Sequence, residues 1–186
     1  IMIIVTKMAD HEKHKDSLLA KIAEMKMTPQ TLDDFAYLGP DTHIPPANVY
    51  TDWNLPKEDK REYLEEFWSM IDPIVEGVAE SLGFLTPDYL IRDYRFAISS
   101  AWFNQYLEGG EHNWHNHPGC QFTNCYYLEL PDAEYKTDVI GADGKIVEYT
   151  VKEGDVMTCP AWMKHRSKPN GPKRKTIIAF NTNYEV

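Results

Sequence analysis

Three of the seven histidines of this chain lie within six positions, in the stretch HNWHNH at residues 112–117. Imidazole is a common metal ligand and a common acid or base near neutral pH, although it is also an ordinary polar surface group. His115 and His117 are two positions apart, and on an ideal strand residues i and i+2 point to the same face. Both imidazoles could therefore enter one cavity.

A third histidine lies in the later segment EGDVMTCPAWMKH, which ends at His165. Gly154 predicts a turn into a short strand, and Pro160 predicts the end of that strand. Because His165 follows His115 by about 50 residues, we expect the two parts of the site to lie on neighbouring strands of a barrel. A close pair of ligands with a distant third is typical of a mononuclear metal site, so His115, His117 and His165 are the predicted metal ligands.

The histidines leave some alternatives open. We expect His112, three residues before His115, to line the site or face a substrate rather than bind the metal. Imidazole ligands suit iron, zinc, copper or nickel, so the ligands alone do not choose the metal. The alternative is that HNWHNH is a solvated loop and that His165 is a surface residue.

Arg174 follows His165 by nine residues and opens the predicted strand RKTIIAFN. Arg174 and Thr176 should share one face of this strand, where a guanidinium can bind a carboxylate through two parallel hydrogen bonds and a hydroxyl can add a third. Tyr127, in CYYLE, could reach the same cavity, and Asn104, in AWFNQY, could approach the same ligand. The alternative for Arg174 is a surface arginine in a run of basic residues.

The composition restricts the class of protein. With 186 residues, 42% of them hydrophobic, we expect a single domain over residues 1–186. The net charge of −10 would repel phosphate backbones and anionic membranes, so we expect no nucleic-acid and no membrane partner. Three cysteines without a CxxC pair form neither a disulfide framework nor a zinc finger, which predicts a reducing, cytoplasmic setting. A homodimer is possible, since nothing in the sequence decides the oligomeric state.

The pattern of apolar residues changes along the chain. The first part, about 1–83, is predicted to begin with a short strand and a helix over about 10–25. An irregular connection over 28–56 should follow. A second helix should then form, which Asp72-Pro73 interrupts and Gly83 ends. After Gly83 the period becomes two. The predicted strands are 89–106, 121–130, 135–140, 145–151, 155–159 and 174–184, with a hairpin turn at 141–144.

This order, helices first and a dense run of antiparallel strands second, predicts an α+β fold. Its core, over about 84–186, would be a jelly roll of the double-stranded β-helix (cupin-like) type. The N-terminal helices would pack on one of its sheets.

The segments HNH, EGDVMTCPAWMKH and RKTIIAFN together resemble the 2-oxoglutarate/Fe(II)-dependent oxygenases, close to small members with an HxHP motif, and YYLE is similar to a strand of the prolyl hydroxylases. The resemblance covers about residues 96–184. It implies that His115 and His165 are iron ligands and that Arg174, with Thr176, holds the distal carboxylate of 2-oxoglutarate. Tyr127 and Asn104 would assist at the cosubstrate.

One position departs from the family pattern. Most members have HxD or HxE, whereas the third position here is His117. A site of three histidines would carry one more positive charge than a site of two histidines and a carboxylate, which would alter the potential of the iron. Alternatively, His117 is not a ligand and a water or a halide completes the site.

The resemblance implies an iron(II)- and 2-oxoglutarate-dependent dioxygenase that hydroxylates an unidentified small-molecule or peptide substrate and releases succinate and CO2. The alternative is a metal-binding cupin, either an enzyme that does not use 2-oxoglutarate or a module that binds a small acid. The pattern Gly109-x5-His115-x-His117 matches the first cupin motif, except that Gln121 occupies the usual glutamate position. A cupin would share the barrel and the metal but would not require Arg174.

Overall fold

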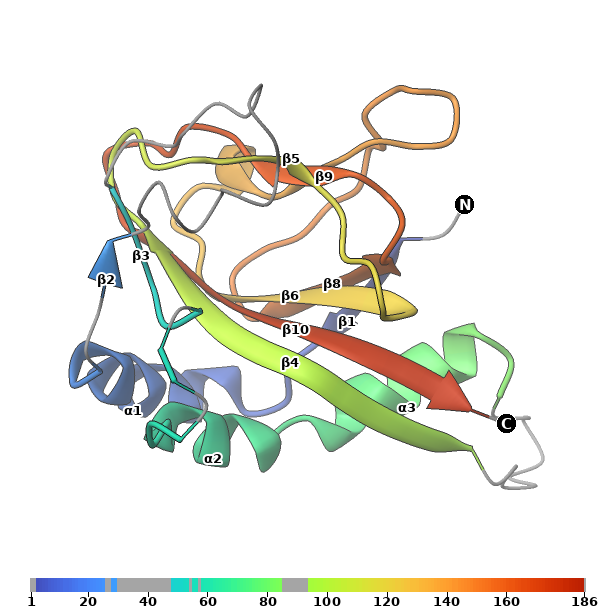
Figure 1. The fold of residues 1–186 in the computed structure, drawn as a ribbon, viewed down its shortest axis with the longest axis horizontal. Helices are drawn as coiled ribbons and strands as arrows, with labels where there is room; N and C mark the ends of the chain where they lie inside the picture. Colours follow the sequence, from blue (N-terminus) through green and yellow to red (C-terminus); the bar gives the residue numbers. More distant parts are fainter. Residues whose placement is uncertain are drawn as a thin grey trace.

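Two antiparallel sheets lie above one another, and a layer of helices covers the outer side of the larger sheet (Figure 1). This computed structural model describes residues 3–25, 28–29, 48–53, 55–56, 58–84 and 94–185. In chain order the elements are β1 (Ile4–Lys7), α1 (His11–Ala23), β2 (Thr28–Pro29), β3 (Val49–Thr51), α2 (Glu62–Trp68), α3 (Asp72–Ser81), β4 (Arg95–Tyr106), β5 (His112–His115), β6 (Phe122–Glu129), the 3-10 turn η2 (Ala133–Tyr135), β7 (Asp138–Val139), β8 (Asp155–Pro160), β9 (His165–Ser167) and β10 (Lys175–Glu185).

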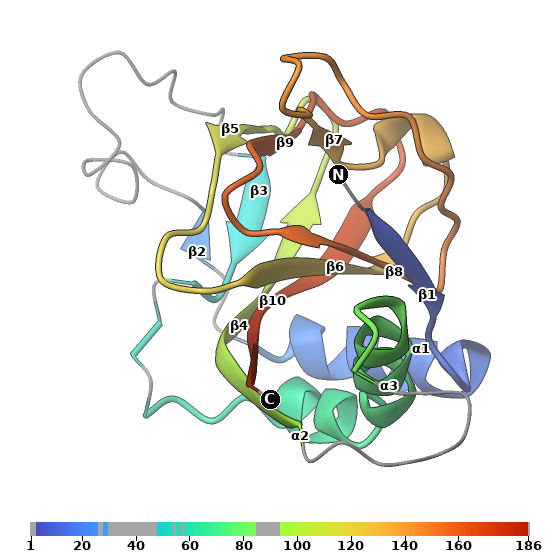
Figure 2. The same cartoon turned by 90° about the vertical axis from the view of Figure 1, so that its right-hand side faces the viewer.

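From β4 onward, the strands alternate between the two sheets. The larger sheet has the order β1-β8-β6-β10-β4-β3-β2, and the smaller sheet has the order β5-β9-β7. The chain therefore passes from β4 in the larger sheet to β5 in the smaller one, returns in β6, and repeats this twice, ending in β10 (Figure 2). This winding is that of a double-stranded β-helix, so the predicted α+β fold with helices packed on one sheet is confirmed.

Successive side chains of β10 point into two different buried clusters, one on each face of the larger sheet. Ile178 and Phe180 point to the helix layer, where they join a buried cluster with Leu18 and Ile22 of α1 and with residues of α2 and α3. Ile177, on the opposite face, belongs to a second cluster between the two sheets. Because successive strand residues point to opposite faces, a shift of one position moves a side chain from one interior to the other.

The helix boundaries follow the sequence signals. Asp72-Pro73 occupies the first turn of α3. A proline is tolerated there because backbone N–H groups of the first turn have no partner within the helix. Gly83, just beyond the helix, has a φ of 76°, which favours glycine. The interruption at Asp72-Pro73 and the end at Gly83 are therefore confirmed. No described helix is long and apolar enough to cross a membrane.

One predicted strand is not formed. Residues 145–151 make a single bridge, Ile140 to Ile146, and then continue without ladder pairing. Val147, Tyr149 and Val151 nevertheless pack on the cluster between the sheets. The alternation of apolar residues over 145–151 therefore indicated that one face of this segment is buried, but not that its backbone pairs with a neighbouring strand.

Other predictions concern the connections. The irregular connection predicted over 28–56 contains the short strands β2 and β3, while its central part, 30–47, lies outside the described residues. The beginning of the predicted strand 89–106 also lies outside them, and β4 is described from Arg95.

Candidate metal centre

Three imidazoles meet at the rim of the smaller sheet. The strands β5 and β9 pair directly, with His115 opposite His165, as predicted from their separation in the sequence. The ring centroids of these two residues lie 4.4 Å apart. One ligand nitrogen from each of His115, His117 and His165 lies within 4.8 Å of the others. The structure thus brings the three predicted metal ligands together.

His117 reaches the site just after β5 ends. Its backbone N–H donates to the carbonyl of Ala161 at 2.9 Å, which ties this segment to the turn between β8 and β9. The His117 ring lies parallel to that of His165, with centroids 5.0 Å apart, and stacks on Trp102 of β4 at 5.6 Å. The Nε2 atoms of His117 and His165 are 3.1 Å apart.

Backbone carbonyls orient two of the rings. Nδ1 of His115 lies 2.6 Å from the carbonyl oxygen of Asn113, and Nδ1 of His165 lies 3.1 Å from that of Met163. A carbonyl only accepts, so Nδ1 of each ring carries the hydrogen and Nε2 keeps its lone pair. Metal-bound histidines are usually held in this way through the nitrogen that does not bind the metal. The donor set therefore fits a metal ion such as iron.

Burial keeps these rings neutral. It lowers the pKa of His115, lowers that of His117 to about 3, and lowers that of His165 well below the usual value. His112, whose ring stacks on His115 at 4.3 Å, has its pKa lowered by the same cause. A metal does not have to displace a proton from Nε2 of His115 or His165, so these two rings are ready to bind it at neutral pH.

A glycine pair explains how the chain turns into this site. Gly109 has a φ of 74°, in the left-handed region. A Cβ on Gly110 would lie 2.4 Å from the carbonyl oxygen of Asn48, so only glycine allows this close approach. The pair carries the chain from β4 in the larger sheet to β5 in the smaller one.

The histidines line a cavity between the sheets, and one predicted cosubstrate residue joins them. Asn104 of β4 is buried and lines this cavity. Tyr127 is buried behind one wall, where its hydroxyl accepts from the backbone N–H of Thr137 at 3.1 Å. Other lining residues are Trp102, Tyr106, Cys125, Ser167, Ile177 and Ala179.

Arg174 and Thr176 are not brought to this cavity. The Nε and Nη2 atoms of Arg174 each donate to Glu129 at 2.9 Å, and the Arg174 side chain is 45% exposed. The hydroxyl of Thr176 also donates to Glu129, at 2.5 Å. The guanidinium predicted to hold a cosubstrate therefore already has a carboxylate partner at the other face of β10.

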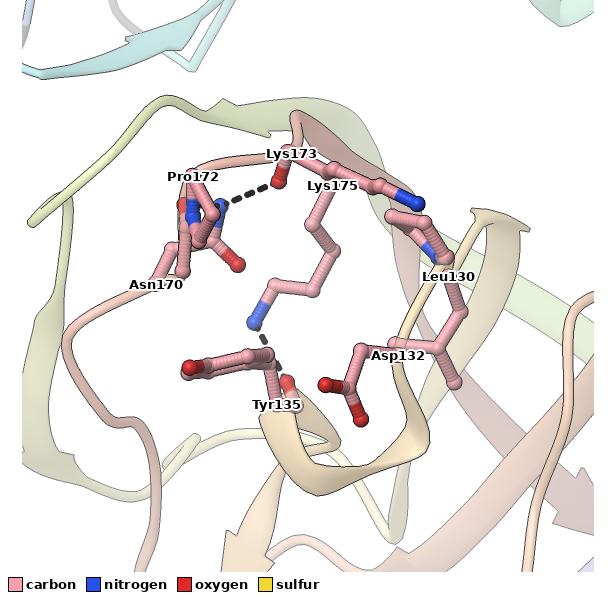
Figure 3. A pocket seen from close by; sticks show the side chains of 9 residues that line it. Leu130, Asp132, Tyr135, Asn170, Pro172, Lys173 and Lys175 are labelled. Carbon is pink, nitrogen blue, oxygen red and sulfur yellow. Dashed lines mark hydrogen bonds between the residues drawn. The ribbon is translucent and has the colours of Figure 1, made fainter.

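The next residue, Lys175, points inward instead. Only 1% of it is exposed, and its ammonium donates to the hydroxyl of Ser167 at 2.5 Å and to the carbonyl of Tyr135 at 2.8 Å. Figure 3 shows the latter bond. The ammonium also lies 4.3 Å from the centre of the Tyr106 ring. Among the described residues, Lys175 has no ion-pair partner, and burial lowers its pKa to about 8.

Lys175 lies beside the histidine cavity. Ser167 and Tyr106, which contact the ammonium, both line that cavity. Lys175 could not be recognised from the sequence because IIAF, at residues 177–180 of the same strand, is apolar at every position. Such a strand is buried on both faces, so no alternation of polar and apolar residues showed which face lies toward the histidines.

The comparisons with known proteins concern the fold. The chain matches no protein-family model and no curated protein sequence. It is similar to the structure of an oxidoreductase of the 2OG-Fe(II) oxygenase family from Burkholderia pseudomallei, with a TM-score of 0.65 and 11% identity over 97% of this chain and 84% of that one. A prolyl-4-hydroxylase from Pseudomonas putida gives a TM-score of 0.61 and 12% identity over 97% and 91%.

A third similar structure is HygX from Streptomyces hygroscopicus, bound to nickel, 2-oxoglutarate and hygromycin B. Its TM-score is 0.66 and its identity 9%, over 97% of this chain and 82% of that one. These likenesses show that the chain has the double-stranded β-helix fold of the 2-oxoglutarate/Fe(II) oxygenases.

Proposed function

We propose that the protein is an iron(II)- and 2-oxoglutarate-dependent dioxygenase. The observation that carries this proposal is a pair of neighbouring features: three neutral imidazoles around a common point, and, beside their cavity, a buried ammonium that has no carboxylate partner among the described residues. A metal would occupy the first and a small dicarboxylic acid would reach from it to the second. The oxygenase fold supports the same conclusion.

His115, His117 and His165 would hold the iron. When bound, iron and 2-oxoglutarate would supply the oxidising chemistry, with release of succinate and CO2. The chain's own contribution is to orient the imidazoles and to exclude water. The stacked Trp102 ring and the apolar side chains of Ile177 and Ala179 close the walls around the histidines.

Lys175 would take the role that was predicted for Arg174. A charge buried without an opposite partner is costly, and a carboxylate at Lys175 would remove that cost. The hydroxyl of Ser167, already 2.5 Å from the ammonium, lies where it could add a hydrogen bond to the same carboxylate. Arg174 and Thr176, held by Glu129, would support the strand from its other face.

The substrate would be a small molecule or a peptide. Both kinds occur among similar structures: HygX holds hygromycin B, and a prolyl hydroxylase from Trichoplax adhaerens holds a peptide fragment of hypoxia-inducible factor, with a TM-score of 0.62. Asn104, buried in the cavity beside the histidines, would face the reactants.

The test is anaerobic reconstitution with Fe(II), followed by addition of oxygen and measurement of succinate formed from 2-oxoglutarate. We expect slow succinate formation by the protein alone and faster formation with a suitable substrate. His165→Ala is the matched control and should form none. An iron-loaded protein that neither binds nor consumes 2-oxoglutarate would instead favour the metal-binding cupin.

A further inference from the structure

Asn181 of β10 contacts the one metal-site histidine that no backbone carbonyl orients. Its amide nitrogen lies 3.3 Å from Nδ1 of His117 and donates to the hydroxyl of Ser100 at 2.9 Å. Its amide oxygen is buried and has no hydrogen-bond partner within the described part of the chain, and the residue is only 6% exposed. A buried polar atom without a partner requires an explanation.

The hydrogen-bond network fixes the hydrogen on each ring. His165 carries its hydrogen on Nδ1, because that atom faces the Met163 carbonyl, so Nε2 of His165 can only accept. Nε2 of His117, 3.1 Å away, must then be the donor. Nδ1 of His117 is therefore left with a lone pair, which accepts from the amide nitrogen of Asn181.

In this arrangement His117 is in the wrong tautomer to bind a metal. A ring that binds through Nε2 needs its hydrogen on Nδ1, and that hydrogen needs an acceptor. Rotation of the Asn181 amide by half a turn would bring its unpartnered oxygen to face Nδ1. The Ser100 hydroxyl allows both orientations, because a hydroxyl can accept from the amide nitrogen or donate to the amide oxygen.

We propose that Asn181 is the positioning residue that makes His117 the third ligand: without metal, one amide orientation lets His117 donate to His165, and with metal the other orientation lets His117 present Nε2. This inference rests on the metal centre of the proposed function. It goes beyond that function by assigning different His117 tautomers and different Asn181 amide orientations to the site without metal and the site with metal. Rotation transfers the two contacts of the amide nitrogen, with Ser100 and His117, to the oxygen, and it leaves the nitrogen where the oxygen had no partner among the described residues.

The first test is the tautomer of each ring in the wild-type protein, read from long-range proton–nitrogen NMR spectra of the histidine side chains. Without metal, we expect the hydrogen on Nε2 of His117 and on Nδ1 of His115 and His165. With one equivalent of zinc, the His117 hydrogen should move to Nδ1. The same His117 tautomer in both samples would overturn the proposal.

The second test measures zinc affinity by competition with a chelator in two Asn181 variants. Asn181→Asp offers only acceptors to Nδ1 and should tighten binding, whereas Asn181→Leu offers none and should weaken it about tenfold or more. A purely structural role would weaken binding in both. Equal effects of the two substitutions would therefore contradict the inference.

The His117→Ala background separates this effect from the added charge of the aspartate. If Asn181 acts through His117, Asn181→Asp should change zinc affinity little in that background, and an undiminished gain would show that charge alone is responsible. Failure of the metal centre itself gives a different result. Zinc affinity that His115→Ala and His165→Ala both leave unchanged would remove the centre and this inference with it.

Discussion

At the scale of single residues, the direction of one side chain decides the proposed cosubstrate site. Arg174 and Lys175 are adjacent and both cationic, but only Lys175 points between the sheets. The sequence predicted that Arg174, at the start of the last strand, would hold the cosubstrate, whereas the structure pairs Arg174 with Glu129. The sequence could not choose between neighbours, because residues on both faces of β10 are buried and the period-two pattern is lost.

The first prediction compares these neighbours. Lys175→Met should weaken 2-oxoglutarate binding to the iron-loaded protein at least about tenfold, since a charge-assisted hydrogen bond contributes about 1.5–3 kcal/mol. Arg174→Met, the matched control, should leave the affinity nearly unchanged because Arg174 is bound to Glu129. Anaerobic calorimetry measures both. The reverse ranking would restore the role first expected of Arg174.

The second prediction follows from the pKa of Lys175, which burial lowers from 10.5 to about 8. A carboxylate binds the ammonium and not the neutral amine, so 2-oxoglutarate affinity should fall as the pH rises above about 8, approaching tenfold per pH unit. Titrations between about pH 7 and 9.5 measure this change, because this range spans the pKa of Lys175. Lys175→Arg should bind more weakly but without this fall, and an equal fall in that variant would assign it to another group.

The same pKa affects stability in a defined direction. Between about 8 and 10.5 the unfolded chain binds the Lys175 proton more tightly than the folded protein does. This group alone therefore makes the folded protein more stable as the pH rises through that window. Stability increases because deprotonation of Lys175 removes the free-energy cost of burying its charged ammonium.

At the scale of elements, long strands were predictable and short ones were not. β6, β8 and β10 appear within a few residues of their predicted bounds because each is a run of apolar and β-branched residues. β5 and β9 are only four and three residues long and consist largely of polar residues. Their pairing depends on the opposite sheet rather than on local propensity, although the HxH motif and the distant histidine still predicted that the three histidines would lie together.

The connection from β3 to α2 is fixed by a buried carboxylate. Asp52, which is fully buried, accepts from Arg61 Nε at 2.9 Å, from the Tyr63 hydroxyl at 2.6 Å and from the Phe103 backbone N–H at 2.9 Å. It thereby joins β3, β4 and α2. Trp53, next along the chain, packs edge-on against Trp102 at 4.5 Å, so the carboxylate also orders one side of the histidine cavity.

The third prediction tests this connection. Asp52→Ala would leave a buried hydroxyl and a buried N–H without their acceptor, and it should lower the free energy of unfolding by about 3–5 kcal/mol. Glu62→Ala is the control, because it removes only the exposed pair with Lys60 and should change stability by less than about 1 kcal/mol. Urea denaturation measures both, and similar losses would contradict the role of Asp52.

At the scale of the whole molecule, the helices and the site occupy opposite faces of one sheet. Helices α1, α2 and α3 bury the outer face of the larger sheet, and the smaller sheet covers the inner face (Figure 1). The switch from helical to alternating periodicity near Gly83 was enough to predict these layers. The pairing order of the strands was not readable, because it depends on long-range contacts and not on local pattern.

The central claim is that the histidine cavity holds iron together with 2-oxoglutarate. The most direct measurement is an anaerobic titration of the Fe(II)-loaded protein with 2-oxoglutarate, followed by the metal-to-ligand absorption band and by calorimetry. We expect one bound equivalent, an absorption band that is absent in His165→Ala, and weaker binding in Lys175→Met. An iron-loaded wild-type protein that shows neither band nor heat would contradict it.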